Sequence, residues 1–181
     1  MARINIVDPA QATGKSKELL TALQNSLKSV PNLAKALANS PAALKAWIEF
    51  DGALAKGSLD AKLRQEIALA VGQKNGCEYC VSAHTAIGKL TGLTDQQILS
   101  SRQGQGTSPK ATAALTFARE LLERRGQVTA SSVQALRDQG FTDGKIAEIV
   151  AHVALNIFTN YFNIALDVDV DFPRVALHQG A

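Results

Sequence analysis

Residues 60–90, DAKLRQEIALAVGQKNGCEYCVSAHTAIGKL, contain two helical patterns separated by a stop signal. In the first half the apolar side chains recur every three or four residues, which predicts a helix over about 60–74. Its buried stripe comprises Leu63, Ile67, Ala70 and Val71. Asn75-Gly76 is a typical helix end, so a second helix begins at or near Cys77 and extends to about residue 90.

The rest of the chain repeats the helical spacing. Alternation of β-branched residues is almost absent and aromatic residues make up 5%, so the sequence predicts an all-α fold. Several starts carry a capping residue, a proline at the first helical position, or the capping box of residues 94–97. The other predicted helices span about 16–28, a segment from 31, 41–54, a short segment from 94, 109–125, 129–139 and 142–166.

The chain has the length of one domain. With 181 residues we expect a single helical domain over 16–173, an N-terminal tail of residues 1–15 and a C-terminal tail of residues 174–181. Charged residues are only 19% and hydrophobic residues 46%, which excludes a disordered chain. A surface with so few charges favours burial by other subunits, hence a homo-oligomer.

Composition also argues against several functional classes. The net charge is only +3 and no basic cluster is interleaved with aromatic residues, so no nucleic-acid partner is expected. There is no signal-peptide pattern and no run of 18 apolar residues, so we expect a cytoplasmic protein without a membrane partner. Two cysteines cannot form the disulfide framework of a small secreted protein.

The segment 142–166 is apolar around almost its whole circumference, which predicts a helix buried on all sides. At 100° per residue its polar side chains form a narrow stripe of His152, Asn156, Asn160 and Asn163. Buried polar groups need partners. Either they are satisfied by backbone or subunit contacts, or His152 and Asn156 border an active site.

Cys77, Cys80 and His84 carry the chemistry. On a helix that begins near Cys77, the three side chains fall within about 60° of one another. Unpaired amides and the positive end of the helix dipole favour a thiolate, a histidine one turn on can accept its proton, and two such sulfurs can cycle between dithiol and disulfide. The alternatives are two inert buried cysteines, a zinc site that recruits His152 or His178, and a static disulfide. The redox interpretation implies no metal or other cofactor.

The same residues resemble a known family. LRQEIALAV at 63–71, NGCEYC at 75–80 and AHT at 83–85 are similar to the core motif of the alkylhydroperoxidase D (AhpD-like) family, within the carboxymuconolactone decarboxylase superfamily. VPN at 30–32, SPAAL at 40–44, AHVALN at 151–156 and NYFN at 160–163 extend the resemblance over about 28–173. It implies an all-helical subunit that assembles into trimers or hexamers, and a peroxidase that reduces organic hydroperoxides.

The resemblance also implies roles. Cys80 attacks the peroxide, Cys77 resolves the sulfenic acid as a disulfide, and His84 belongs to a proton relay; an external dithiol protein or a small thiol returns the electrons. The relay's carboxylate is replaced by Gln65, with Glu66 beside it. Because one residue turns a helix by 100°, we expect either an altered relay in which Gln65 only orients His84, with Glu66 solvated, or help from Glu66.

Tyr79 is a second departure from the family pattern, since some family members have histidine there; we interpret it as a packing aromatic at the possible border of the site.

Two other functions compete with peroxidase activity. One is the acid/base chemistry of the lactone decarboxylase branch, which does not depend on a cysteine pair. The other is a non-enzymatic, redox-sensing oligomer.

Overall fold

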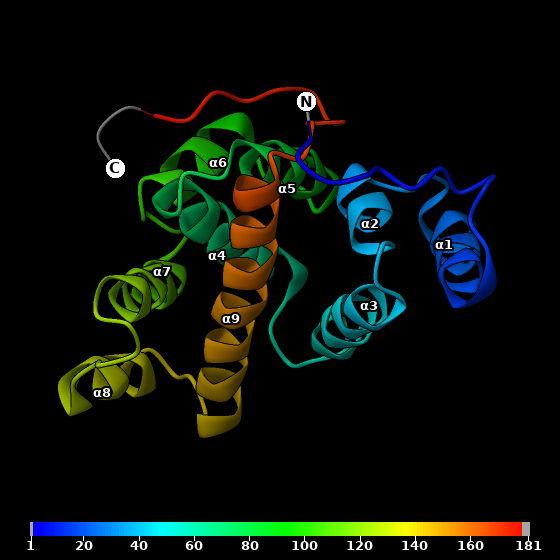
Figure 1. Cartoon of the computed structure of the whole chain (residues 1–181). Helices are drawn as coiled ribbons and strands as arrows, with labels where there is room; N and C mark the ends of the chain where they lie inside the picture. Colours follow the sequence, from blue (N-terminus) through cyan, green and yellow to red (C-terminus); the bar gives the residue numbers. More distant parts are fainter. Residues whose placement is uncertain (1, 179–181) are drawn as a thin grey trace.

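The computed structural model describes residues 2–178, and within them the chain forms helices and no strand, as predicted (Figure 1). The helices are α1 (Gly14–Leu27), α2 (Asn32–Leu37), α3 (Pro41–Ala55), α4 (Ala61–Lys74), α5 (Glu78–Leu90), α6 (Asp95–Arg102), α7 (Pro109–Glu123), α8 (Ala130–Asp138) and α9 (Asp143–Leu166). Each begins and ends within two residues of its predicted limits where both were given, because local capping chemistry determines these ends.

The turn between α4 and α5 positions the cysteines. Asp60 caps α4 by accepting a hydrogen bond from the Leu63 backbone N–H. The helix ends at Asn75, and Gly76 takes a φ of 72°, a left-handed conformation that favours glycine. Cys77 is then the N-cap of α5. The expected placement of Cys77 at the start of a helix is confirmed.

α9 runs between two groups of helices (Figure 1). In this view α1, α2 and α3 lie to its right, and α7 and α8 to its left. α4 packs against α5, α6, α7 and α9, so it is the central helix of the bundle. Its buried residues include Leu69 and Val71, both 0% exposed. The α4–α5 turn is thereby held against α9.

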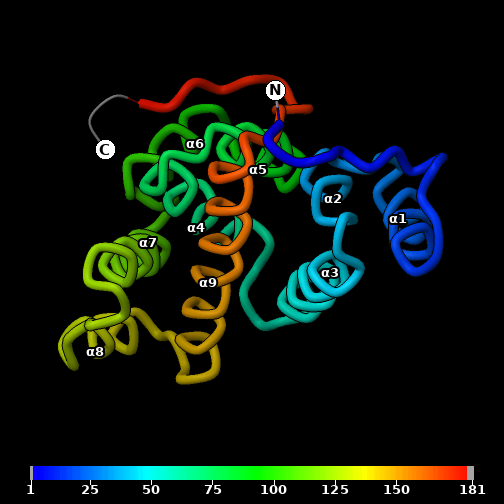
Figure 2. Tube along the Cα trace, viewed as in Figure 1, coloured from blue at the N-terminus to red at the C-terminus, as the bar shows by residue number. Residues whose placement is uncertain are grey.

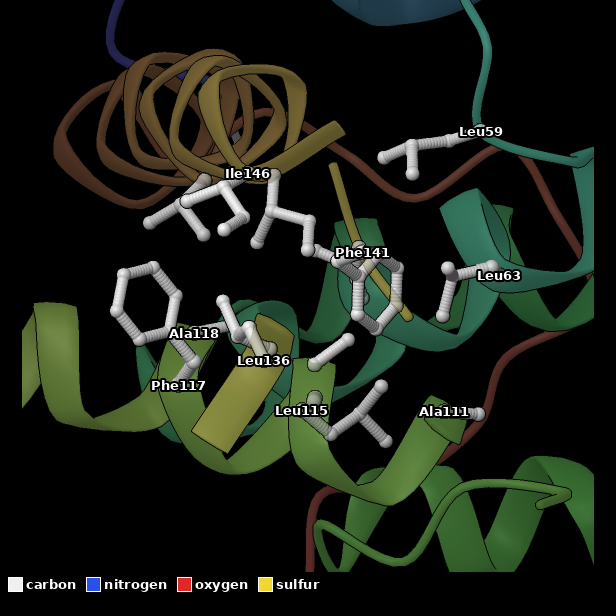
Figure 3. Packing of buried hydrophobic residues seen from close by; sticks show 14 of the residues in the cluster. Leu59, Leu63, Ala111, Leu115, Phe117, Ala118, Leu136, Phe141 and Ile146 are labelled. Carbon is white, nitrogen blue, oxygen red and sulfur yellow. The ribbon is translucent and has the colours of Figure 1, made fainter. Parts of the chain in front are cut away.

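Two large clusters of buried apolar residues fill most of the molecule, beside a small third one of Leu69, Leu93 and Ile98. The larger one joins α4, α7, α8 and α9, and includes Leu63, Leu115, Leu136, Phe141 and Ile146 (Figure 3). The other joins α1, α2, α3 and the first turn of α5, and it contains both cysteines. The cysteine pair therefore lies in an apolar region, where exposed charge is excluded and hydrogen bonds are strengthened.

The two segments expected to be tails lie against the helices. Figure 2 shows the described parts of both at the same end of the bundle. The backbone N–H of Val7 donates to the carbonyl of Lys35 at 3.2 Å, and that of Arg3 to the carbonyl of Leu166 at 2.7 Å. In the C-terminal part of the chain Phe172 packs in the cluster of the cysteines, and Arg102 donates to the carbonyl of Ala176. Both segments therefore cover helices.

The expectation that α9 is buried on all sides is wrong within the subunit. Neighbouring helices cover the faces that they contact, and an outer stripe stays exposed: Val150 at 42%, Phe158 at 37%, Tyr161 at 58% and Ile164 at 43%. By length and composition alone α9 meets the criterion for a membrane span, but a core helix of a bundle meets it equally. The exposed stripe is the feature that a partner surface would cover.

Candidate functional site

The cysteine pair is reduced and buried. Cys77 is 1% and Cys80 3% exposed, and both are free thiols. The backbone N–H of Cys80 donates to Cys77 Sγ at 3.2 Å, because the N-cap side chain folds back over the first turn of α5. This geometry brings both sulfurs to one end of the helix.

Asn163 on α9 completes the surroundings of the second sulfur. Its Nδ2 donates to Cys80 Sγ at 3.4 Å across the packed α5 and α9 helices. One turn earlier, Asn160 accepts a hydrogen bond from Asn75 Nδ2 at 2.9 Å, which ties α9 to the α4–α5 turn. The amide stripe of α9 therefore faces the cysteines.

The two thiols differ in acidity. Burial raises the pKa of Cys80, but hydrogen bonds from Cys77 and Asn163 outweigh burial, so the pKa of Cys80 lies below its ordinary value. The hydrogen bond to Cys80, and then burial, raise the pKa of Cys77. Of the two thiols, Cys80 is therefore the one that ionises more readily.

His84 is held by Gln65. His84 Nδ1 lies 2.8 Å from Gln65 Oε1; since a carbonyl oxygen only accepts, Nδ1 carries the proton and Nε2 keeps its lone pair. Burial, and then the charge of His152, lower the pKa of His84 to about 4. A neutral imidazole able to accept a proton results. Within residues 2–178 no hydrogen bond joins His84 to either sulfur, although all three side chains share one face of α5.

Glu66 lies elsewhere. It is 1% exposed, which contradicts the expectation of a solvated side chain, and its Oε1 accepts a hydrogen bond from the Thr107 backbone at 2.6 Å. Burial raises the pKa of Glu66. The 100° rotation between neighbouring helical positions turns Glu66 toward the loop before α7, while Gln65 faces α5. Gln65, and not Glu66, therefore orients His84.

We expect Glu66→Gln to leave the rate at which peroxide oxidises the cysteine pair unchanged, since an amide oxygen still accepts from Thr107. Gln65→Glu is expected to raise the pKa of His84 from about 4, because a carboxylate then faces Nδ1, and to speed oxidation near neutral pH. Stopped-flow oxidation rates of both variants between pH 6 and 9 test this. A large loss in Glu66→Gln with no gain in Gln65→Glu would contradict the placement of Glu66.

The remaining candidates lie around this centre. His152 is 6% exposed, and no described residue forms a hydrogen bond with its Nε2. Asn156 Nδ2 donates to the backbone carbonyl of His152 at 2.8 Å. His152 therefore interacts with the site through its charge, which lowers the pKa of His84. Asn156 instead forms a hydrogen bond within α9. Tyr79 accepts from the Leu33 backbone at 3.1 Å and packs edge-on against Phe172. Tyr79 therefore has the contacts of a packing residue.

Neither described surface hollow contains a cysteine. The larger, about 660 Å³, lies between α7 and α8, and the smaller, about 250 Å³, lies beside Glu66 and Thr107. Within residues 2–178 no three His, Cys, Asp or Glu side chains gather as metal ligands.

Sequence reasoning placed Asn160 and Asn163 in the polar stripe but chose His152 and Asn156 as its functional members. The stripe itself was the available signal. Which of its four residues contacts the sulfurs depends on the position along the α9 axis at which α5 packs. Helical periodicity gives the angle of a side chain around the helix and carries no information about that position.

Comparison with known proteins supports the fold and finds similarity to one family in the middle of the chain. Residues 41–120 match the model of the Carboxymuconolactone decarboxylase family, a region that includes both cysteines and His84. No curated protein matches the chain.

Solved structures share the fold over nearly the whole chain. An alkylhydroperoxidase AhpD core, an uncharacterised peroxidase-related protein from Ralstonia eutropha JMP134, is 24% identical with a TM-score of 0.85, covering 94% of this chain and 92% of its own. A peroxidase-related protein from Silicibacter sp. TM1040 is 22% identical with a TM-score of 0.81, covering 99% and 94%. The debrominase Bmp8, in complex with 2,3,4-tribromopyrrole, is 19% identical with a TM-score of 0.78 over 94% of each chain. The predicted AhpD-like fold is confirmed.

Proposed function

We propose that this chain, an AhpD-like member of the carboxymuconolactone decarboxylase superfamily, is a thiol-dependent peroxidase that reduces organic hydroperoxides. The observation that carries the proposal is the asymmetry of the cysteine pair: the pKa of Cys80 is lowered and that of its hydrogen-bonded neighbour Cys77 is raised. A thiolate beside a protonated thiol suits one sulfur for attack and the other for resolution.

Two steps make up the proposed reaction. The Cys80 thiolate attacks the hydroxyl oxygen of the hydroperoxide; the O–O bond breaks, Cys80 becomes a sulfenic acid and the alkoxide leaves as an alcohol after taking up a proton. The Cys77 sulfur then attacks the Cys80 sulfur, a disulfide forms and water leaves. An external dithiol, a protein or a small thiol, reduces the disulfide. His84 Nε2 is the proposed acceptor of the thiol proton, reached through water.

Brief treatment with one equivalent of cumene hydroperoxide is expected to convert two titratable thiols to none and to yield one equivalent of alcohol. Peptide mass spectrometry should place the new bond between Cys77 and Cys80. Survival of both thiols would overturn the proposal and favour the acid/base chemistry of the decarboxylase branch. Disulfide formation without turnover in the presence of dithiothreitol would leave only a redox sensor.

The fold alone does not select this reaction, since one scaffold hosts several activities and the similar debrominase Bmp8 has another. Acid/base decarboxylation needs no cysteine pair. Here two buried thiols share one hydrogen-bonded site with the Asn163 amide of α9, an arrangement suited to stabilising a thiolate. Peroxidase chemistry uses that arrangement, and decarboxylation does not.

We further propose that the protein is a cytoplasmic homo-oligomer, a trimer or a hexamer, whose subunits cover the exposed stripe of α9. Residues 150, 158, 161 and 164 provide a continuous apolar face on one helix. A reducing compartment would keep both thiols available for repeated cycles.

Light scattering on the wild-type chain is expected to give a trimer of the 19.2 kDa subunit or a multiple of it. Tyr161→Asp, which puts a charge on a side chain 58% exposed in the isolated subunit, is expected to shift the mass toward the monomer. Leu90→Asp is the matched control, because Leu90 is 88% exposed but lies on α5. A wild-type monomer at micromolar concentration, or equal dissociation of both variants, would contradict this assembly.

A further inference from the structure

Of the two polar side-chain atoms of Asn163, one forms a hydrogen bond to the reactive sulfur and the other forms none within the described chain. Its side chain is 3% exposed, and Nδ2 donates to Cys80 Sγ at 3.4 Å. Oδ1 of the same amide is buried and finds no hydrogen-bond partner in the described part of the chain. A buried acceptor without a partner is unfavourable, and its presence next to a reactive group indicates a place for a ligand that donates a hydrogen bond.

Asn160 supplies the complementary atom. It is 0% exposed, and its Oδ1 accepts a hydrogen bond from Asn75 Nδ2 at 2.9 Å. Its Nδ2 has no hydrogen-bond partner of ordinary geometry among residues 2–178, but the Asn160 side chain lies close enough to Cys80 to lower its pKa. Residues three apart on a helix lie on the same face, so Asn160 and Asn163 point to the same side of α9. One free donor and one free acceptor are therefore directed to the same region.

A hydroperoxide matches this pair of atoms. Its terminal O–H is a donor, and its second oxygen is an acceptor that gains negative charge as the O–O bond breaks. His84 and Gln65 do not offer a free donor and a free acceptor beside the sulfur. They are hydrogen-bonded to each other and, within the described chain, form no hydrogen bond to either sulfur. The amide groups that face Cys80 come from α9 instead.

We infer that Asn163 is a catalytic residue that binds both reactants: Nδ2 stabilises the Cys80 thiolate, and Oδ1 accepts the hydrogen bond of the hydroperoxide O–H. Asn160 Nδ2 donates to the oxygen that leaves. The inference rests on the proposed peroxidase function and adds to it the groups that hold the substrate.

The amides hold the reactants and exchange no protons. As the sulfur–oxygen bond forms and the O–O bond breaks, the electron pair passes to the leaving oxygen, where a fixed donor stabilises it. A proton from water completes the alcohol and replaces the one lost when the thiol ionised. Sulfur is oxidised, and the peroxide is reduced.

The test compares two reactions of Cys80 in a Cys77→Ser background, in which Cys80 is the only thiol. Alkylation by iodoacetamide needs only the thiolate, whereas sulfenic acid formation with cumene hydroperoxide needs the thiolate and the oxygen contacts. Asn163→Ala and the nearly isosteric Asn163→Leu are measured with both reagents at pH 7. Asn39→Ala is the control, since the Asn39 amide donates to the Asn5 and Ala36 carbonyls, away from the cysteines.

Both Asn163 variants are expected to alkylate more slowly and to lose about tenfold or more additional rate with the hydroperoxide. The control should keep both rates. Equal slowing of the two reactions, or no slowing of either, would overturn the inference. A Cys77→Ser protein that alkylates at Cys80 but does not react with the hydroperoxide would instead overturn the proposed function.

Discussion

Cys80→Ser is expected to abolish hydroperoxide consumption, to below about one part in a thousand of the wild-type rate, because a hydroxyl is not ionised at neutral pH and cannot replace the thiolate. Cys77→Ser should consume one equivalent per subunit and then stop, since no second thiol resolves the sulfenic acid. Coupled turnover with dithiothreitol and one-equivalent burst measurements check both results.

The physical basis of this asymmetry is the pattern of donors. The position of Cys77 at the N-terminus of α5 by itself favours ionisation of Cys77. In the folded chain the Cys77 thiol and the Asn163 amide both donate toward Cys80, which lowers the pKa of Cys80 and raises that of Cys77. A dimedone adduct on Cys80 in Cys77→Ser supports this order; an adduct on Cys77 in Cys80→Ser, together with peroxide consumption there, would reverse the roles.

Acidification below pH 6.5 is expected to destabilise the fold steeply. Burial is the main cause that lowers the pKa of both His84 and His152 from 6.5 to about 4. Between these values the unfolded chain binds protons that the folded chain does not. Stability is therefore fully present above pH 6.5 and falls as the pH decreases toward 4, by about 1.4 kcal/mol per histidine per pH unit.

The surrounding charges set the balance. Arg64 lowers the pKa of His152 and Glu148 raises it, and the charge of His152 lowers the pKa of His84, so the two histidines titrate as a coupled pair. Glu66 acts in the opposite direction: burial raises its pKa, so the folded state gains a proton on acidification. Asp51, whose pKa burial also raises, acts like Glu66, whereas the lowered pKa of Glu148 acts in the same direction as the histidines. The expected net effect of acid is a loss of stability.

Urea unfolding at pH 7, 6, 5 and 4.5 measures the free energy of unfolding. His152→Leu should reduce the pH slope to less than half, since it removes one buried histidine and the charge that acts on the other. An unchanged slope in this variant would contradict the coupling of the pair. For each protein the free energy of unfolding at pH 7 serves as the reference, because His84 and, where present, His152 are neutral at that pH.

The residues of the α4–α5 region determined much on their own. Apolar spacing and capping residues predicted the helices, and the Asn75-Gly76 stop predicted Cys77 at a helix start; these features depend on neighbours along the chain. The choice between Gln65 and Glu66 as the partner of His84 also had a local cause, the 100° step between helical positions, but its outcome depended on which face of α4 meets α5.

Tertiary packing decided the rest. The sequence predicted four polar residues in a stripe on α9, and only the packing of α5 on α9 brings Asn163 to Cys80 and leaves Asn156 bonded to its own helix. The same packing leaves an outer stripe of α9 uncovered, which its all-round apolar composition did not predict. Periodicity specifies the angle of each side chain around a helix; contacts between helices separated by about 80 residues also require the relative height and rotation of the two helices, which only the folded chain supplies.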